Sequence, residues 1–460
     1  MLRVHLETMG CQMNLLDSEL VASSLVRSGM EMVDSPRGAD VLLFNTCSVR
    51  QHAEDKVHSH VGQACQRKAA GKRLVVGVLG CMAQRMGAEL MQRHSGLDIV
   101  CGPGQLGKLP ELIQSAYDGA AGTVAVDLPR RGTPRELAEH RADLDCLRDP
   151  TKTHLPGQAF VRIMHGCDKF CSYCVVPHAR GPEVSRSPEH IGEEIARLAD
   201  AGVTQVTLLG QTVNSYRYQQ GGKTWTLADL LELASGPAGI RRVRFITSYP
   251  TGFDDAIFQA MAGLPKVCQY LHVPAQSGSD RILAAMNRRY SRAEYDDLID
   301  RARAALPNIA IAGDFIVGFP GETDDDFAAS ADLVRRSRYK TCYVFKYSPR
   351  PGTMAAEKLP DDVPEAVKKR RNNELLDVQE AISLEINQGL IGTKQEVLVE
   401  GPSPRSDKQP GLRPEGIAQM LGRTRSDHIT VFDGPPDLAG QYVTVEILSA
   451  TALTLIGRKA

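Results

Sequence analysis

The chain has 460 residues, 42% of them hydrophobic, which is enough apolar material for several buried cores and suggests two to four domains. Lys and Arg number 54 and Asp and Glu 55, so the net charge of −1 provides no general attraction for nucleic acid. No apolar stretch approaches the ~20 residues that cross a bilayer, and residues 1–11 do not resemble a signal peptide. We therefore expect a cytoplasmic protein with no membrane partner, whose eleven cysteines are ligands or reduced core thiols.

Residues 1 to about 117 alternate short β-rich runs with helical patterns, which predicts a parallel α/β sheet. Cys11, Cys47 and Cys81 each follow one of the expected strands. Because the carboxyl ends of parallel strands share one edge of a sheet, these thiols are expected to converge into a three-cysteine site. The alternative is that each is a small buried residue at a strand end.

Residues 118–157 carry charge, Pro and Gly but few bulky apolar side chains, and we interpret them as a linker. Five further cysteines show no common pattern. We interpret them as structural or incidental: Cys65, Cys101, Cys146, Cys268 and Cys342.

The most specific pattern is a C-x-x-x-C-x-x-C triplet directly after an apolar run, formed by Cys167, Cys171 and Cys174. Three thiolates at this spacing hold three irons of a [4Fe-4S] cluster and leave the fourth iron open to a ligand that is not protein. The alternatives are a structural zinc site with His165 or His178 as fourth ligand, or three unrelated core cysteines. Zinc sites usually use a second cysteine pair, and none lies nearby, so the spacing favours the cluster.

Residues 158 to about 350 repeat strand, loop and helix six times, which predicts six units of a (β/α)8 barrel with one side open to a macromolecular substrate. Polar loops follow the expected strands and should line one mouth around the triplet. Gln211, Asn214 and Ser277 in these loops are candidate ligand contacts or loop-capping residues.

The remaining residues divide into a helix and a β-rich segment. Residues 364 to about 388 form an amphipathic helix, and four cations on it are expected to face solvent or, alternatively, to contact phosphate: Lys368, Lys369, Arg370 and Arg371. Period-two stretches from 389 to 460 predict a small antiparallel barrel of about five strands. Arg423 and Arg425 within it are candidate local RNA contacts.

With Tyr173 just before its third cysteine, the triplet resembles the radical S-adenosylmethionine (SAM) superfamily, in which SAM binds the open iron. Both triplets, together with LHVPAQSGS, DFIVGFPGET, YSPRPGT and GRT, resemble the radical SAM methylthiotransferase family over essentially all 460 residues. The resemblance implies a cluster domain at 1–117, a linker at 118–157, a partial radical SAM barrel at 158–388 and a TRAM domain at 389–460.

Two [4Fe-4S] clusters held by the six cysteines and a SAM site are implied by this resemblance. The implied SAM contacts are Tyr173, Gln211, Asn214, Ser277, Gly318, Gly321 and Glu322. The last three could otherwise be a tight turn into a helix. Thr212, Ala275 and Met354 depart from the family pattern at the edges of this site.

The implied activity is transfer of a methylthio group to carbon 2 of N(6)-dimethylallyladenosine, next to the anticodon in tRNA. The implied partners are tRNA and an electron donor such as flavodoxin or ferredoxin. Two alternatives remain. One is a sister methylthiotransferase for threonylcarbamoyl-adenosine or a ribosomal-protein aspartate, and the other is an iron–sulfur protein that binds RNA or carries electrons without catalysis.

Overall fold

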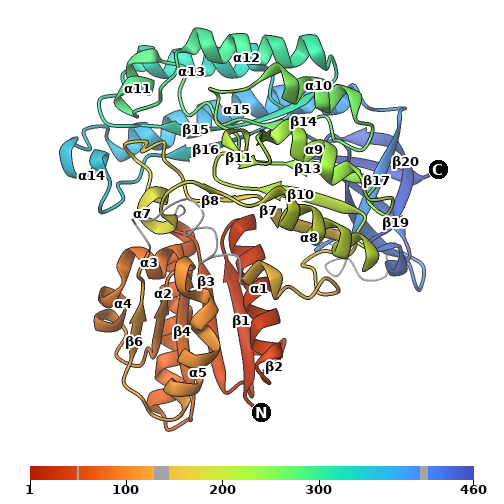
Figure 1. The fold of residues 1–460 in the computed structure, drawn as a ribbon. Helices are drawn as coiled ribbons and strands as arrows, with labels where there is room; N and C mark the ends of the chain where they lie inside the picture. Colours follow the sequence, from red (N-terminus) through yellow and green to blue (C-terminus); the bar gives the residue numbers. More distant parts are fainter. Residues whose placement is uncertain (49–50, 129–143, 405–412) are drawn as a thin grey trace.

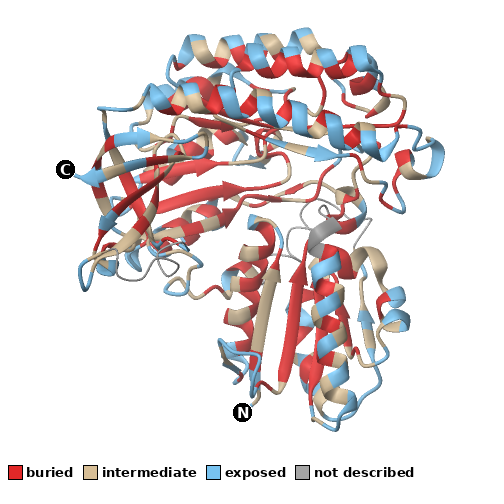
Figure 2. Ribbon diagram, turned by 180° about the vertical axis from the view of Figure 1, so that it is seen from behind, coloured by how far each residue is buried: buried red, intermediate tan, exposed pale blue. Residues whose placement is uncertain are grey.

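The computed structural model describes residues 1–48, 51–128, 144–404 and 413–460. Along the chain it consists of a parallel α/β sheet, an open barrel with outer helices, and a closed β-barrel (Figure 1). Strand interiors are buried, whereas the outer helices alternate buried and exposed faces (Figure 2). The α/β fold class and its three architectures are therefore as the sequence predicts.

The N-terminal sheet has six parallel strands in the order β2-β1-β3-β4-β5-β6. The strands are β1 (Arg3–Met9), β2 (Glu31–Met32), β3 (Val41–Thr46), β4 (Val75–Gly80), β5 (Ile99–Cys101) and β6 (Thr123–Ala125). The helical elements are α1 (Gln12–Arg27), α2 (Gln51–Ala69), α3 (Cys81–Met86), α4 (Ala88–Arg93), η1 (Pro103–Lys108) and α5 (Leu109–Tyr117). Every residue of β3 and β4 is buried, because helices cover both faces of the sheet, and this explains their unbroken apolar sequences.

The segment expected as a linker needs correcting where it is described. Thr123–Ala125 forms β6 and pairs in parallel with β5, so the sheet extends past residue 117. Sequence periodicity does not detect a strand of three residues. Residues 129–143 of the expected linker lie outside the described residues.

A second correction concerns residues 144–150, which carry buried charge. Arg148 is only 2% exposed and donates to Glu19 of α1 at 2.6 Å and to Glu194 at 3.0 Å. Asp145 accepts from Arg162 at 2.5 Å. This part of the expected linker therefore packs between the N-terminal sheet and the barrel and joins them by ion pairs.

All six barrel strands predicted from the sequence are present: β7 (Gln158–Arg162), β10 (Gln205–Leu209), β13 (Arg242–Phe245), β14 (Tyr270–His272), β15 (Ala310–Val317) and β16 (Thr341–Lys346). They form two parallel sheets, β13-β10-β7 and β14-β15-β16, and a parallel bridge between Val243 and Val267 joins the two. The covering helices are α8 (Pro188–Asp200), α9 (Leu227–Ser235), α10 (Asp255–Gly263), α11 (Asp280–Ala285), α12 (Arg292–Ala305) and α13 (Asp324–Ser337). One large apolar core fills the space between strands and helices.

Short elements decorate the barrel mouth and its outer side. They are β8 (Met164–His165), α7 (Val176–Arg180), β9 (Val184–Ser185), η2 (Val213–Ser215), β11 (Arg217–Gln220), β12 (Lys223–Thr226) and α14 (Met354–Lys358). Helix α7 comes directly after the second cysteine triplet and packs on α3 of the N-terminal part.

Helix α15 (Glu365–Gln388) forms where the sequence predicts it, but its basic cluster divides into two pairs. Lys369 and Arg370 are exposed, as expected for a solvated face. Lys368 and Arg371 are only 3% and 4% exposed, so the expectation of solvent or phosphate contact is wrong for them. Glu322 of the barrel pairs with Arg371, and Asp361 of the loop before α15 pairs with Lys368.

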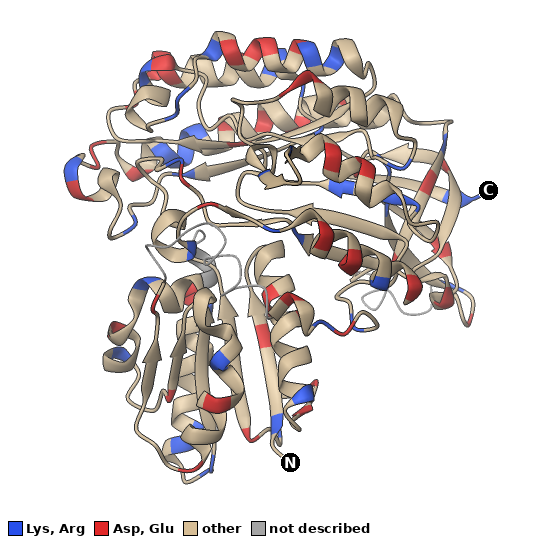
Figure 3. Cartoon of the chain, viewed as in Figure 1, with Lys and Arg blue, Asp and Glu red and all other residues tan. Residues whose placement is uncertain are grey.

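The closed barrel has the strand order β17-β18-β19-β21-β20. Its elements are β17 (Lys394–Pro402), β18 (Ala418–Thr424), β19 (Ile429–Gly434), η4 (Pro436–Leu438), β20 (Tyr442–Ala450) and β21 (Thr454–Lys459). Five strands are as predicted; one neighbouring pair, β19 and β21, is parallel rather than antiparallel. Acidic and basic residues are interspersed along the outer helices and this barrel (Figure 3).

Two buried arginines of β13 fasten the closed barrel to the open one. Arg242 is fully buried and donates to the carbonyl oxygen of Arg423 at 3.0 Å, and Arg244 donates to the carbonyl oxygen of Arg425 at 3.1 Å. The Arg423 side chain pairs with Glu400 and Asp427, and that of Arg425 donates to backbone carbonyls of the open barrel. Both residues therefore help to hold the junction between the barrels.

Candidate functional site

Cys11, Cys47 and Cys81 lie at one edge of the N-terminal sheet, as the strand pattern predicts. Cys11 precedes α1, Cys47 follows β3 and Cys81 begins α3. The Cys11 thiol interacts directly with Cys47 by a hydrogen bond and with Cys81 through space. The structure therefore brings together three thiols that are far apart in the sequence.

Two buried asparagines explain why the cysteines stand beside glycines. Asn14 donates to the Asn45 side chain at 3.1 Å and lies against Gly10, where a Cβ atom would come within 2.6 Å of its Oδ1. Gly80 has a φ of +89°, and a Cβ there would lie 2.4 Å from Asn45 Oδ1. Only glycine allows the strand ends to approach this closely.

The three-cysteine site contains a buried positive charge. Arg180, at the end of α7, hydrogen-bonds to the Cys81 thiol and lies close to Cys11. A hydrogen bond from Cys47 and the charge of Arg180 lower the pKa of Cys11 to about 6, against the opposing effect of burial. Burial raises the pKa of Cys81, and Arg180 opposes that rise. A guanidinium among thiols favours the anionic thiolate form that iron binds.

The second triplet lies in the loop between β8 and α7, at the carboxyl end of the barrel strands. Burial raises the pKa of Cys167 to about 11 and that of Cys174 to about 12. Hydrogen-bond donors point at all three sulfurs: Arg288 Nη1 at 3.5 Å from Cys171 Sγ, the Val176 N–H at 3.5 Å from Cys174 Sγ, and the Lys169 N–H at Cys167. Such donors stabilise charge on thiolate sulfur when a metal displaces the protons.

A [4Fe-4S] cluster and a single zinc ion place different demands on their ligands. Within the described residues, no three His, Cys, Asp or Glu side chains are grouped as ligands of a single metal ion. A [4Fe-4S] cluster takes one thiolate per iron, so its ligands stand farther apart than those of one zinc ion. His178, one of the two histidines considered for zinc, is exposed.

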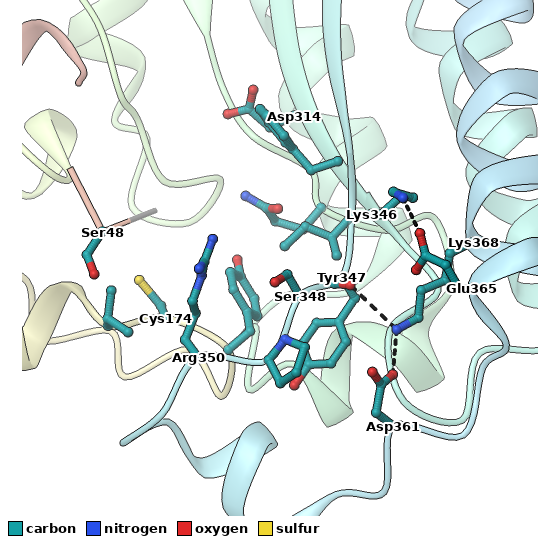
Figure 4. Close-up of a pocket in the computed structure, with 16 residues that line it drawn as sticks. Ser48, Cys174, Asp314, Lys346, Tyr347, Ser348, Arg350, Asp361, Glu365 and Lys368 are labelled. Atoms are coloured by element: carbon teal, nitrogen blue, oxygen red, sulfur yellow. Dashed lines mark hydrogen bonds and ion pairs between the residues drawn. The ribbon is translucent and has the colours of Figure 1, made fainter. Parts of the chain in front are cut away.

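A pocket of about 670 Å³ opens at the barrel mouth beside the second triplet (Figure 4). Cys174 and Arg350 lie at one end, close to Ser48, which directly follows Cys47 of the first triplet. Lys346, Lys368 and their acidic partners lie at the other end. The cavity is therefore lined by a cysteine of the second triplet and by the residue next to a cysteine of the first.

Gln211, Asn214 and Ser277 differ in how much hydrogen-bonding capacity they retain. The buried Gln211 Oε1 has no hydrogen-bond partner among the described residues, which fits a contact with a bound ligand. The Asn214 amide donates to the carbonyl oxygens of Tyr249 and Thr251 and accepts from the Tyr249 N–H at 2.8 Å. Ser277 accepts from a backbone N–H at 3.2 Å. These contacts favour the loop-capping interpretation for Asn214 and Ser277.

Gly318, Gly321 and Glu322 form a closed turn behind the pocket wall. Glu322 accepts from the Gly318 N–H at 3.0 Å and from Arg371 at 2.8 Å, and burial raises the pKa of its carboxyl. Gly318 has a φ of +69°, and a Cβ there would lie 2.3 Å from Lys368 Cγ. The glycine is thus required by the approach of α15.

Tyr173 lines the pocket next to Cys174, and its ring packs edge-on against Phe319. Of the three positions that depart from the family pattern, Thr212 is buried and donates to Glu183 at 3.0 Å. Ala275 is fully buried, and Met354 is 41% exposed. Each is accommodated without contact to a cysteine sulfur in the interactions observed.

Several pocket residues are not singled out by the sequence patterns. Gln276 lines the pocket with a φ of +70°, a strained conformation that is typical of functional sites. Asp314 accepts from His272 Nε2 at 3.1 Å, and the buried Tyr347 hydroxyl has no hydrogen-bond partner in the part of the chain that the structure describes. Asp314 could have been identified from the sequence, because it is the one carboxylate in the otherwise apolar strand β15.

Two family models match the chain. The uncharacterized protein family UPF0004 matches residues 3–102, and the Radical SAM superfamily matches residues 161–334. Over 456 residues the chain is 48% identical to the tRNA-2-methylthio-N(6)-dimethylallyladenosine synthase of Rhodopirellula baltica, with 99% of this chain and 95% of the relative covered. The chain belongs to the radical SAM methylthiotransferase family.

Other relatives of this methylthiotransferase agree. The Chromobacterium violaceum protein of the same name is 42% identical over 459 residues, covering 99% of this chain and 98% of the relative. Among solved structures, the radical S-adenosylmethionine methyltransferase TsrM from Kitasatospora setae is similar at a TM-score of 0.53 and 14% identity, covering 77% of each chain. That likeness concerns the fold. Among the described residues, no helix of the methylthiotransferase has the length and apolarity to span a membrane.

Proposed function

We propose that this chain adds a methylthio group to carbon 2 of N(6)-dimethylallyladenosine next to the anticodon of tRNA. One observation carries the proposal: a single pocket is lined by Cys174 of the second triplet and by Ser48, which directly follows Cys47 of the first. Replacing the hydrogen on carbon 2 requires hydrogen removal and group delivery at the same atom. A base held between the two triplets would meet both requirements.

The two triplets would hold two [4Fe-4S] clusters, and the pocket would hold SAM and the base. When bound, these cofactors supply an electron, a hydrogen-abstracting radical and the methylthio group. The protein would hold the cysteine sulfurs through Arg180 and Arg288 and would exclude water with Tyr173, Ile316 and Phe345. An electron donor such as flavodoxin or ferredoxin would serve the enzyme in the cytoplasm.

The pocket wall favours a prenyl group over a threonylcarbamoyl group. Its apolar members include Tyr173, Val175, Ile316, Tyr347 and Pro349. Burying five prenyl carbons at ~0.8 kcal/mol each contributes about 4 kcal/mol, or roughly a thousandfold preference over plain adenosine.

A threonylcarbamoyl carboxylate, in contrast, would need a cation. The cations on the wall already have acidic partners: Lys346 pairs with Glu365, Lys368 with Asp361 and Arg350 with Glu54. An unpaired carboxylate in this wall would be costly.

The test incubates the reconstituted enzyme with anticodon stem-loops that carry unmodified, prenylated or threonylcarbamoylated adenosine. The amount of methylthiolated product from each stem-loop is then compared. Methylthiolated product from the prenylated stem-loop alone supports the proposal. Equal turnover of the threonylcarbamoylated stem-loop, or product only from a ribosomal-protein peptide, would assign the chain to a sister activity. Failure of the reduced protein to cleave SAM would assign it to the non-catalytic class.

A further inference from the structure

Strand β16 forms the open edge of the barrel and presents one face to the pocket. Tyr343 pairs with Asp314 of β15, and Phe345 pairs with Ile316. Asp314, Ile316 and Phe345 all line the pocket. Because alternate residues of a strand share a face, Tyr343 lies on this same inner face, further from the mouth.

The two aromatic side chains on this face are unusually exposed. Tyr343 is 49% exposed and Phe345 38%, whereas the intervening residue, Val344, and the preceding Cys342 face the packed side. Among the aromatic residues that the structure describes, Phe170 of the cluster loop is the only other one with more than a third of its surface exposed. All three belong to the segments that surround the barrel mouth.

The position of Tyr343 extends this face toward the closed barrel. Its hydroxyl interacts electrostatically with Arg423 of β18 and with Tyr270 of β14. The inner face of β16 therefore runs from the closed barrel, past Tyr343 and Phe345, to the pocket beside Cys174.

The spacing of the two rings fits nucleic-acid bases. Same-face residues two apart on a strand are about 6.6 to 6.8 Å apart, which is roughly twice the ~3.4 Å separation of stacked bases. Aromatic side chains on open sheet faces bind single-stranded RNA by stacking, because every base has an apolar face. The chain is nearly neutral, so its net charge provides little general attraction for phosphate, and stacking would supply affinity that net charge does not.

We propose that Tyr343 and Phe345 form a stacking surface for unpaired bases of the anticodon loop and guide the target base into the pocket. The proposal rests on the tRNA substrate of the proposed function, and it identifies the surface that receives the RNA. Phe345 would contact the target nucleotide, and Tyr343 a neighbouring base on the side of the closed barrel.

The experiment replaces each ring by an apolar side chain that is not flat. The test variants are Phe345→Leu and Tyr343→Leu, and the aromatic controls are Phe345→Tyr and Tyr343→Phe. For each reconstituted holoenzyme, the dissociation constants of unmodified and prenylated anticodon stem-loops are measured. Each Leu variant should weaken binding of both stem-loops roughly 5- to 150-fold, and each aromatic exchange should stay within about twofold. The slope of log K against log salt should not change, because no phosphate contact is lost.

A matched control is Leu376→Ala on the outer face of α15, an exposed apolar residue that should leave binding unaltered. Unchanged affinity in both Leu variants, with normal RNA binding by the wild type, would overturn the inference and leave the proposed function intact. If the Leu variants lose affinity only for the prenylated stem-loop, the rings contact the prenyl tail. If they lose affinity for SAM to the same extent, the rings contact the cofactor. Either result would overturn the stacking proposal. Absence of RNA binding by the wild-type enzyme would contradict the proposed function itself.

Discussion

Arg180 and Asp17 form a buried ion pair that links the two cysteine sites. Arg180 Nη2 donates to Asp17 Oδ2 at 2.8 Å, and the two side chains are 5% and 1% exposed. Arg180 comes from the helix after the second triplet, and Asp17 from the helix after Cys11. Because Arg180 also hydrogen-bonds to Cys81, one side chain fixes the loop of one cysteine site against the other.

Removing this guanidinium should destabilise the fold and the N-terminal cysteine site together. Arg180→Gln leaves Asp17 buried with only Arg162 as cationic partner, and we expect a loss of about 3 kcal/mol in the free energy of unfolding. Iron bound at Cys11, Cys47 and Cys81 should fall in parallel, as measured in a variant that lacks the second triplet.

The control for this prediction is the exposed pair of Arg370 and Glu374, one turn apart on α15. Arg370→Gln should leave the free energy of unfolding nearly unchanged, because solvent screens an exposed ion pair. Combining Arg180→Gln with Asp17→Asn should recover part of the loss, because no buried charge is then left unpaired. Equal stability of Arg180→Gln and Arg370→Gln would contradict a structural role for the buried pair.

Gly80, directly before Cys81, is predicted to be intolerant of any side chain. Gly80→Ala combines a positive φ with a Cβ that would lie 2.7 Å from the Thr46 carbonyl oxygen, so the expected destabilisation is about 2–6 kcal/mol. Gly416→Ala is the matched control, since Gly416 also has a positive φ but open space around it. Thermal unfolding of the two variants should separate the clash from the backbone strain, and similar melting temperatures would refute the packing argument.

The junction of α15 with the closed barrel should weaken in acid because of His428. Burial lowers the pKa of His428 to about 3, and its Nδ1–H donates to Asn387 Oδ1 at 2.8 Å. In the unfolded chain the His428 imidazole binds a proton near pH 6.5, whereas in the folded chain it stays neutral down to about pH 3. The free energy of unfolding therefore falls as the pH drops from about 6.5 toward 3.

At pH 5 this single group should cost about 2 kcal/mol relative to neutral pH. Urea denaturation at pH 7.5 and pH 5 should reveal the loss in the wild type and a smaller one in His428→Gln, which keeps a hydrogen-bond donor. Identical pH dependence in both proteins would exclude His428 as the source.

The two cysteine triplets should bind clusters independently. Each cluster requires three thiolates from its own domain, so alanine substitution of one set should leave about half of the iron and sulfide after anaerobic reconstitution. Loss of Cys167, Cys171 and Cys174 should abolish SAM cleavage. Loss of Cys11, Cys47 and Cys81 should preserve SAM cleavage but eliminate methylthio product, and normal tRNA modification by that variant would contradict the two-cluster arrangement.

The local sequence was sufficient to predict those features that depend on a single strand, helix or loop. The six barrel strands follow from apolar runs bounded by polar loops, and Cys167, Cys171 and Cys174 lie within eight residues of one another. The convergence of Cys11, Cys47 and Cys81 was predictable as well, because parallel topology fixes which strand ends meet.

The tertiary structure decided the partners of the charged residues and the composition of the pocket wall. Lys368 and Arg371 resemble a solvated helix face in sequence, yet Glu322 approaches Arg371 from the barrel and Asp361, in the loop before α15, pairs with Lys368, and the two carboxylates allow their burial. Arg180 and Asp17 are 163 residues apart, and no local periodicity connects them. The energy of a buried charge depends on the neighbours that folding brings to it, and those neighbours come from distant segments of the chain.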